Sequence, residues 1–183
     1  MEVINTNLEG LLLLNPDVHE DQRGYFLETF SKENYKDLGI KDNFVQDNLS
    51  KSIKGTLRGL HYQLESPQAK LVRVVRGKVF DVAVDVRSGS DTFGKHFSVI
   101  LDDLTNNQLY IPKGFAHGFC VISEEAIFEY KCSDYYVPDD QLGLIWNDPL
   151  LEIDWPIENP LISLKDQKLP SLSSIKSILL PKF

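Results

Sequence analysis

In the segment 80–87 the large apolar residues Phe80, Val82, Val84 and Val86 alternate with Asp81, Ala83, Asp85 and Arg87, and this pattern limits what the chain can fold into. A period of two is that of a half-buried β-strand, and a helix does not produce it. Similar short segments recur at 25–30, 44–50, 56–63, 71–75, 97–101, 109–111, 118–122 and 126–131. Turn residues such as Arg76-Gly77-Lys78 and Pro112-Lys113-Gly114 separate them. Eight or more short strands at this spacing predict an all-β sandwich or barrel.

Helical signals are weak and local. Residues 31–39 are predicted to form one short helix, with Ser31 as N-cap and Gly39 beyond its end, and residues 171–180 another. No repeat, linker or change of composition divides the chain, and the proline-punctuated segment 149–170 is expected to run over the surface of the barrel. With 183 residues the chain is predicted to form one domain, residues 1–183, with one sizeable core.

Composition excludes several classes of function. The net charge is −8 and the pI is about 5.0, which opposes a broad nucleic-acid or anionic-membrane surface, so any anionic ligand must be held by a local group of bases. No apolar run approaches the ~20 residues that cross a bilayer, and nothing near the N-terminus resembles a secretory signal. The two cysteines, Cys120 and Cys132, are expected to be reduced thiols, so a cytoplasmic location is predicted.

Two short runs contain the histidines that could carry chemistry. In Arg58-Gly59-Leu60-His61-Tyr62-Gln63 a histidine lies in an apolar strand, although a lone strand histidine is more often a structural core or surface group. Lys70 opens the next apolar strand, where it is either a solvated strand end or a buried charge that needs an anion. The run from Ile111 to Phe119 delivers His117 between two aromatic residues after a Pro-Gly turn.

The pattern Pro112-x-Gly114-x-x-His117 looks like the second half of the cupin signature, and Gly55 followed by His61 looks like the start of the first half. A metal-binding cupin continues with a second histidine and a glutamate, whereas this chain has Gln63 at the second histidine position. Two imidazoles without a matching carboxylate make a poor site for zinc or non-haem iron, which typically take three protein ligands. We therefore predict no metal.

Ten short runs occur in one order and together closely resemble the dTDP-4-dehydrorhamnose 3,5-epimerase family, from about Leu11 to Pro170. They are Asp21-x-Arg23-Gly24-Tyr25-Phe26-x-Glu28, Gln46-x-Asn48-x-Ser50, Arg58 to Gln63, Lys70-Leu71-Val72, Asp85-x-Arg87, Pro112 to Phe119, Tyr130 with Tyr136, Trp146-Asn147-Asp148-Pro149, Ile153-x-Trp155-Pro156 and Ser163-x-Lys165-Asp166. The resemblance implies a cupin-type jelly-roll barrel, a homodimer, and no metal or organic cofactor.

The resemblance also implies a substrate, a 4-keto-6-deoxyhexose linked to thymidine diphosphate. Its C4 ketone acidifies the C–H bonds at C3 and C5, but proton removal succeeds only if the enolate is stabilised as it forms. A base must take the proton from one face, a cation must hold the oxyanion, and an acid must return a proton to the opposite face. The resemblance assigns His61 as the base, paired with Asp166, Lys70 as the enolate stabiliser and Tyr130 as the acid. Without it, Tyr130 would be interpreted as a core aromatic.

For substrate binding, the resemblance places Arg23 and Arg58 at the diphosphate, with further contacts from Gln46, Asn48, Glu28, Phe26, Tyr136, Lys165 and His117. Phe26 and Tyr136 are the stacking residues, and His117 is either a ligand contact or a remnant of cupin ancestry. Arg58 and His61 are three apart and should face opposite sides of a regular strand. Either Gly59 marks a bulge or Arg58 reaches a partner subunit's site.

The sequence has to be weighed against four rival functions. Relatives that epimerise C3 alone, or act as 3,4-ketoisomerases on the same nucleotide sugar, need the same His, Lys and Tyr inventory. A non-catalytic sugar-nucleotide-binding cupin would tolerate loss of the base, the cation or the acid, and all three are present. A metal-dependent cupin dioxygenase or isomerase lacks its ligands.

Overall fold

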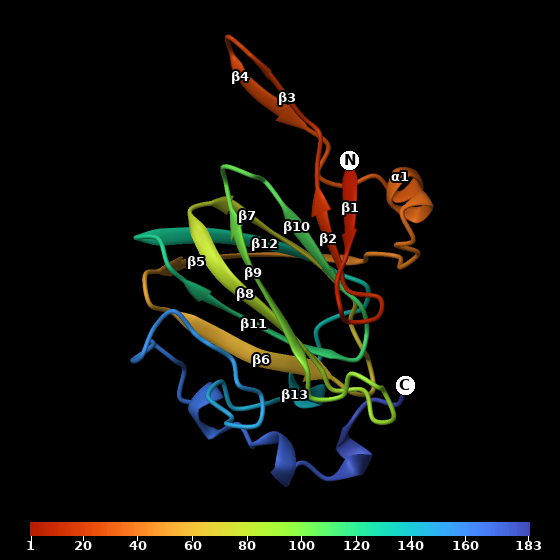
Figure 1. The fold of residues 1–183 in the computed structure, drawn as a ribbon, viewed down its shortest axis with the longest axis vertical. Coiled ribbons are helices and arrows are strands. Elements are labelled where there is room, and N and C mark those ends of the chain that lie inside the picture. The colour runs from red at the N-terminus through yellow and green to blue at the C-terminus, as the bar shows by residue number, and fades with distance from the viewer.

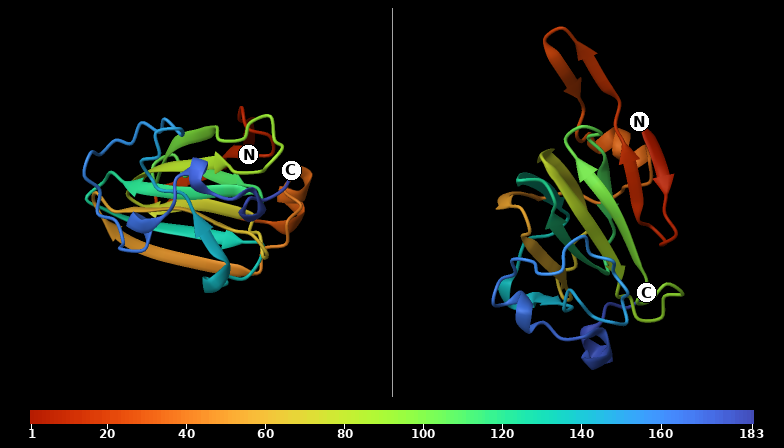
Figure 2. Two further views of the ribbon diagram at one scale, coloured as in Figure 1. Left: turned by 90° about the horizontal axis from the view of Figure 1, so that it is seen from below. Right: turned by 60° about the vertical axis from the view of Figure 1, so that its left-hand side comes forward.

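The computed structural model describes residues 1–183, and two antiparallel β-sheets stacked face to face form its body (Figure 1, Figure 2). The strands are β1 (Glu2–Asn5), β2 (Leu12–Asn15), β3 (Val18–Asp21), β4 (Gly24–Leu27), β5 (Gln46–Ile53), β6 (Leu57–Gln63), β7 (Lys70–Arg76), β8 (Lys78–Asp85), β9 (His96–Asp102), β10 (Gln108–Ile111), β11 (Phe115–Val121), β12 (Glu125–Cys132) and β13 (Gln141–Gly143). One sheet has the order β1-β2-β10-β7-β12-β5 and the other β13-β6-β11-β8-β9. The predicted all-β class is confirmed.

The predicted helix at 31–39 is confirmed as α1 (Lys32–Asp37). The Ser31 hydroxyl accepts a hydrogen bond from the Asn34 backbone N–H at 3.4 Å, and Gly39 follows the helix with φ +96°. The buried Tyr35 anchors α1 by donating its phenol hydrogen bond to Gln108 of β10 at 2.8 Å.

The predicted helix at 171–180 is wrong. This segment contains two 3₁₀ turns, η3 (Leu172–Ser174) and η4 (Ser177–Leu179), after two others, η1 (Pro138–Asp140) and η2 (Asp166–Lys168). Serine hydroxyls compete for local hydrogen bonds, and Ser174 donates one to the Ser171 carbonyl oxygen at 2.8 Å. Leu172 and Leu180 instead pack onto the five-stranded sheet, so tertiary packing shapes the tail.

The strand β8 is buried on both faces, not half-buried as its alternation predicts. Two of its valines, Val82 and Val84, pack outward against the C-terminal part of the chain, which crosses the outer face of the five-stranded sheet. Val79 and Ala83 face inward and join the core between the two sheets. Segment 149–170 follows this outer surface as expected (Figure 1). Because the C-terminal part covers the outer face, the outward-facing residues of β8 are buried as well as the inward-facing ones.

The β3–β4 hairpin projects from the body and pairs with no other strand (Figure 1, Figure 2). Its aromatic side chains are largely in solvent, with Phe26 71% and Tyr25 53% exposed. The structure contains no helix long and apolar enough to span a membrane.

Candidate active site

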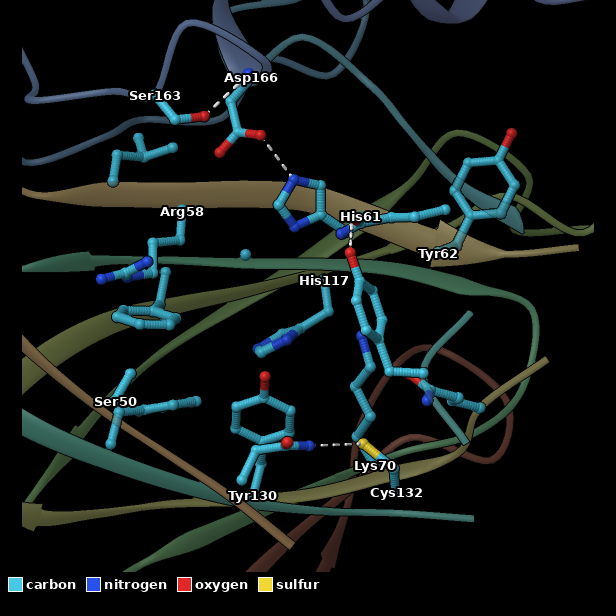
Figure 3. Close-up of a pocket in the computed structure, with 18 of the residues that line it drawn as sticks. Ser50, Arg58, His61, Tyr62, Lys70, His117, Tyr130, Cys132, Ser163 and Asp166 are labelled. Carbon is cyan, nitrogen blue, oxygen red and sulfur yellow. Dashed lines mark hydrogen bonds and ion pairs between the residues drawn. The ribbon is translucent and has the colours of Figure 1, made fainter. Parts of the chain in front are cut away.

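A cavity of roughly 540 Å³ opens between the two sheets, within the size range of small-molecule sites. All four residues predicted to be catalytic line it (Figure 3). They come from different elements: His61 from β6, Lys70 from β7, Tyr130 from β12 and Asp166 from η2. Residues more than 100 positions apart therefore converge on one space.

His61 and Asp166 form a hydrogen-bonded pair at one side of this cavity. The distance from His61 Nε2 to Asp166 Oδ1 is 2.8 Å, and the carboxylate side chain is only 7% exposed. Burial raises the pKa of Asp166, but the hydrogen bond and the charge of His61 outweigh it, so the pKa lies below its ordinary value. An ionised Asp166 fixes the ring orientation and stabilises the imidazolium that a base becomes.

A bulge allows Arg58 and His61 to face the same cavity. The register between β6 and β11 shifts at this point, and Gly59 has φ +118°. A Cβ on Gly59 would lie 2.6 Å from the Cα of Gly118, so only glycine permits this close approach of the two strands. Of the two explanations for the three-residue spacing, the bulge is the one observed, and Arg58 lines the cavity of its own chain.

Tyr130 lies across the cavity from the His61–Asp166 pair, with Lys70 to one side (Figure 3). Burial raises the pKa of the Tyr130 phenol, which favours its protonated form. Burial lowers the pKa of Lys70, and charges at Cys132 and Asp81 raise it without offsetting the burial. The ammonium group of Lys70 makes no hydrogen bond or ion pair within the chain, which leaves it free for an anion.

His117 is the direct cross-strand neighbour of His61 and lines the same cavity. Its Nε2 lies 2.9 and 3.0 Å from the two oxygens of Asp81, a fully buried residue of β8. Gln63, at the position of the second metal-cupin histidine, uses its side-chain amide to bond the backbone of residues 66, 135 and 137. No group of three or more His, Cys, Asp or Glu side chains converges on a metal-binding position.

Of the predicted nucleotide-binding residues, Asn48, Arg58 and Tyr136 line the cavity. Gln46 is not part of the lining, but its amide donates to the Asn48 side-chain oxygen at 2.9 Å and accepts from the Tyr136 backbone N–H at 3.0 Å. Lys165 lies outside the lining but donates to Gln141 at 2.8 Å. Gln141 also accepts from the Tyr136 phenol at 2.9 Å, so Lys165 supports the rim.

Arg23, Phe26 and Glu28 are not brought to the cavity of their own chain. Arg23 and Phe26 belong to the projecting hairpin, where the Arg23 side chain is 85% exposed and pairs with Asp21 at 2.5 Å. Glu28 follows β4 and accepts a hydrogen bond from Asn34 of α1 at 2.8 Å. The β3–β4 hairpin that carries Arg23 and Phe26 projects away from the two stacked sheets (Figure 1).

Three residues received no role from the sequence: Ser50 and Cys132, which line the cavity, and Asp81, which contacts the lining residue His117. The Ser50 hydroxyl is buried without a hydrogen-bond partner, the one such side-chain atom in the structure, and it lies in the cavity wall. Cys132 is the cross-strand partner of Lys70, and burial raises the pKa of its thiol. Ser50 was visible as the last residue of Gln46-x-Asn48-x-Ser50, on the same strand face, whereas the other two had no local signal.

Fold and site together define a cupin-type barrel with an acid–base pocket: a histidine–carboxylate pair, a phenol and an ammonium group surround one cavity. Residues 5–174 match the family model described as dTDP-4-dehydrorhamnose 3,5-epimerase. The chain belongs to this family.

Individual relatives agree with the family match. The chain is 52% identical over 168 residues to a dTDP-4-dehydrorhamnose 3,5-epimerase of Shigella flexneri, which covers 91% of this chain and 93% of the relative. A 3,5-epimerase of Legionella pneumophila, crystallised with dTDP-4-keto-L-rhamnose, superposes with a TM-score of 0.97 at 49% identity, over 100% of this chain and 98% of that one. A 3′-monoepimerase of Streptomyces bikiniensis, in complex with dTDP-quinovose, gives a TM-score of 0.90 at 36% identity, over 97% and 91%. The predicted cupin-type barrel is confirmed by these neighbours.

Proposed function

We propose that this chain inverts C3 and C5 of dTDP-4-keto-6-deoxy-D-glucose through an enolate to give dTDP-4-keto-L-rhamnose. The observation that carries the proposal is the placement of a base and an acid on opposed sides of one cavity, His61 with Asp166 on one side and Tyr130 on the other (Figure 3). Inversion requires removal of a proton from one face of the sugar and return of a proton to the other.

The proposed chemistry conserves protons at each centre. His61 takes the C–H proton and becomes an imidazolium, which the Asp166 carboxylate stabilises. The electron pair moves onto O4, where Lys70 and His117 supply positive charge or a hydrogen-bond donor. Tyr130 gives its phenol proton to the opposite face and recovers one from solvent, while His61 releases its own. The site then treats the second carbon in the same way.

The nucleotide end is proposed to lie along Arg58, Asn48 and Tyr136. The Arg58 Nε donates to the Ser52 hydroxyl at 3.1 Å, so the two terminal nitrogens of its guanidinium are left to meet the diphosphate. Tyr136 is 46% exposed and offers a ring face on which thymine can stack.

We further propose a homodimer in which the β3–β4 hairpin of one subunit completes the cavity of the other. An isolated two-stranded hairpin is marginally stable in water, and this one carries two exposed aromatic rings. Docking on a second copy would cover those rings and carry Arg23, Phe26 and Glu28 to the partner's diphosphate and base. A cytoplasmic location is proposed because both cysteines are unpaired thiols.

Deuterium incorporation tests the reaction. After incubation with dTDP-4-keto-6-deoxyglucose in deuterated water, two deuterons per product, at C3 and C5, are expected. One deuteron at C3 would instead identify the C3-only epimerase, a candidate favoured by the similarity to the Streptomyces monoepimerase. If no deuterium were incorporated, the result would favour a non-catalytic protein that binds the sugar nucleotide.

Mixing two inactive variants tests the exchange of hairpins. Arg23→Ala and His61→Asn should each be inactive alone, whereas a mixture that has exchanged subunits should recover activity. In the mixed dimer, the body with an intact His61 receives the hairpin with an intact Arg23. No recovery, despite exchange demonstrated by mass spectrometry, would place Arg23 at its own chain's cavity and contradict this arrangement.

A further inference from the structure

Asp81 is a buried carboxylate for which the fold alone gives no reason. It lies in the middle of β8, opposite Phe119 of β11, with none of its surface exposed. Its hydrogen bonds all go to the His117 ring, at 2.9 and 3.0 Å. The other buried aspartate of this strand, Asp85, is held by Arg87, Ser90 and Thr92 in a structural network. Burying a carboxylate is costly unless it is paired, so Asp81 depends on a residue of the cavity wall.

The two basic side chains of this part of the wall, His117 and Lys70, both have an open side. The His117 Nδ1 forms no hydrogen bond within the chain. It is also not among the fully buried atoms, so it is accessible from the cavity. The same holds for the Lys70 ammonium group. Figure 3 places the His117 ring between His61 and Tyr130, with Lys70 alongside. These are the donors that face the proposed enolate oxygen.

We propose that Asp81 is the buried counter-charge of the enolate-binding wall. Through the bond to Nε2 it holds the His117 ring with Nδ1 toward the cavity, and its negative charge favours an ammonium group at Lys70 in the same enclosed space. Asp81 is thus a positioning residue that acts through two groups that touch substrate. The inference rests on the proposed function only in naming the enolate as the anion that this wall receives.

The charges around Lys70 give the sign of the effect. Burial lowers the pKa of Lys70, and the charges of Cys132 and Asp81 act in the opposite direction. Removal of Asp81 therefore lowers this pKa further, and Lys70 loses its proton at a lower pH. The other titratable groups of the cavity lining remain in place in that variant, in which His117 loses the carboxylate it contacts. They come from β6, β11, β12, η2 and the segment after β12: Arg58, His61, Tyr62, His117, Tyr130, Cys132, Tyr136 and Asp166.

The substitution Asp81→Asn keeps the shape and removes the charge, and Asp102→Asn is its control. Asp102 is a buried aspartate of the same sheet that contacts no residue of the cavity lining and instead bonds the turn at 104–105. In Asp81→Asn, kcat at the wild-type optimum should fall about tenfold or more, as expected for a lost charge-assisted hydrogen bond, while KM changes less than about twofold. The alkaline limb of the kcat profile should move to lower pH. Asp102→Asn should leave kcat and the profile unchanged.

Chemical labelling measures the Lys70 charge without substrate. Competitive acetylation with acetic anhydride, quantified at Lys70 by mass spectrometry across pH, should reach half-maximal reactivity at least about half a pH unit lower in Asp81→Asn than in wild type. If Asp81→Asn does not fold, Asp81→Ser, which removes the same charge and can still accept from Nε2, should give the same shift. An unmoved labelling curve in a folded variant overturns the proposal. So does a moved curve with an unchanged kcat profile. Failure of the wild type to exchange substrate hydrogen would instead refute the proposed function, since labelling needs no turnover.

Discussion

The substitution Asp166→Asn tests whether the His61–Asp166 pair serves catalysis. Asparagine keeps the size of the side chain but removes the charge that faces His61 Nε2 at 2.8 Å. A hydrogen bond to a charged group is worth about 1.5–3 kcal/mol, and each ~1.36 kcal/mol is tenfold in rate, so kcat should fall roughly 10- to 150-fold. KM should change little, because the imidazolium forms only as the reaction proceeds.

Solvent deuterium exchange at C3 and C5, followed by NMR, is the assay, and Asp148→Asn is the control. Asp148 is also buried in the C-terminal part of the chain, but its carboxylate accepts from the backbone N–H groups of Leu150 and Leu172. Its substitution should lower the melting temperature and leave the rate per folded enzyme unchanged. An Asp166→Asn enzyme that retains more than about a third of the wild-type exchange rate would refute a catalytic role, because that loss is under ~0.7 kcal/mol.

The same substitution has a signature in stability. The folded pKa of Asp166 lies below its ordinary 3.8, so its contribution is fully present above that value and is lost as pH falls through the folded pKa. The difference in unfolding free energy between wild type and Asp166→Asn, measured by denaturant titration, should therefore be largest at neutral pH and shrink below about pH 3.8.

Four further outcomes are expected. His61→Ala and Lys70→Ala should both abolish turnover and leave dTDP binding measurable by calorimetry; more than about a tenth of the wild-type rate in either would contradict its role, since that is under ~1.4 kcal/mol. Tyr130→Phe should stay folded and still exchange some substrate hydrogen while inversion falls about 10²- to 10⁴-fold, and an unimpaired inversion rate by NMR would return Tyr130 to the core. Ser50→Ala should raise KM roughly 3- to 10-fold with kcat nearly constant, because the ligand loses a donor that has no partner in the chain; an unchanged KM would show that the hydroxyl does not contact substrate. Excess EDTA should leave steady-state activity unchanged, and a stoichiometric metal whose removal abolishes activity would contradict the predicted metal independence.

Much of the barrel could be predicted because its central strands carry their pattern locally. The segments predicted at 71–75, 97–101 and 126–131 lie within β7, β9 and β12. The missed strands, β1, β2, β3 and β13, have four residues or fewer, a length at which the period of two is a weak signal. The C-terminal tail failed for another reason, since its apolar residues pack onto a sheet that no local pattern identifies.

The candidate catalytic residues could be named from the order of the sequence motifs, but the arrangement of their side chains around the cavity could not. The bulge at Gly59 depends on contact with Gly118, almost sixty residues away, so the common orientation of Arg58 and His61 could only be offered as one of two alternatives. Hairpin residues such as Arg23 carry a binding motif yet lie outside their own chain's cavity, because the β3–β4 hairpin pairs with no other strand of the chain and no local pattern predicts where it projects.

Asp81 illustrates the limit most clearly. In an alternating strand with one wet face, its position belongs to the polar side, where an aspartate is an ordinary solvated residue. The alternation itself is correct, but neither face is in solvent. The C-terminal part of the chain covers the face that carries Val82 and Val84, and the opposite face is the interior of the barrel. An aspartate that faces the interior must find a partner, and the partner within reach is His117. The position of the polar side chain in the strand pattern could thus be derived from the sequence, whereas its role depends on which side of the sheet the last forty residues cover.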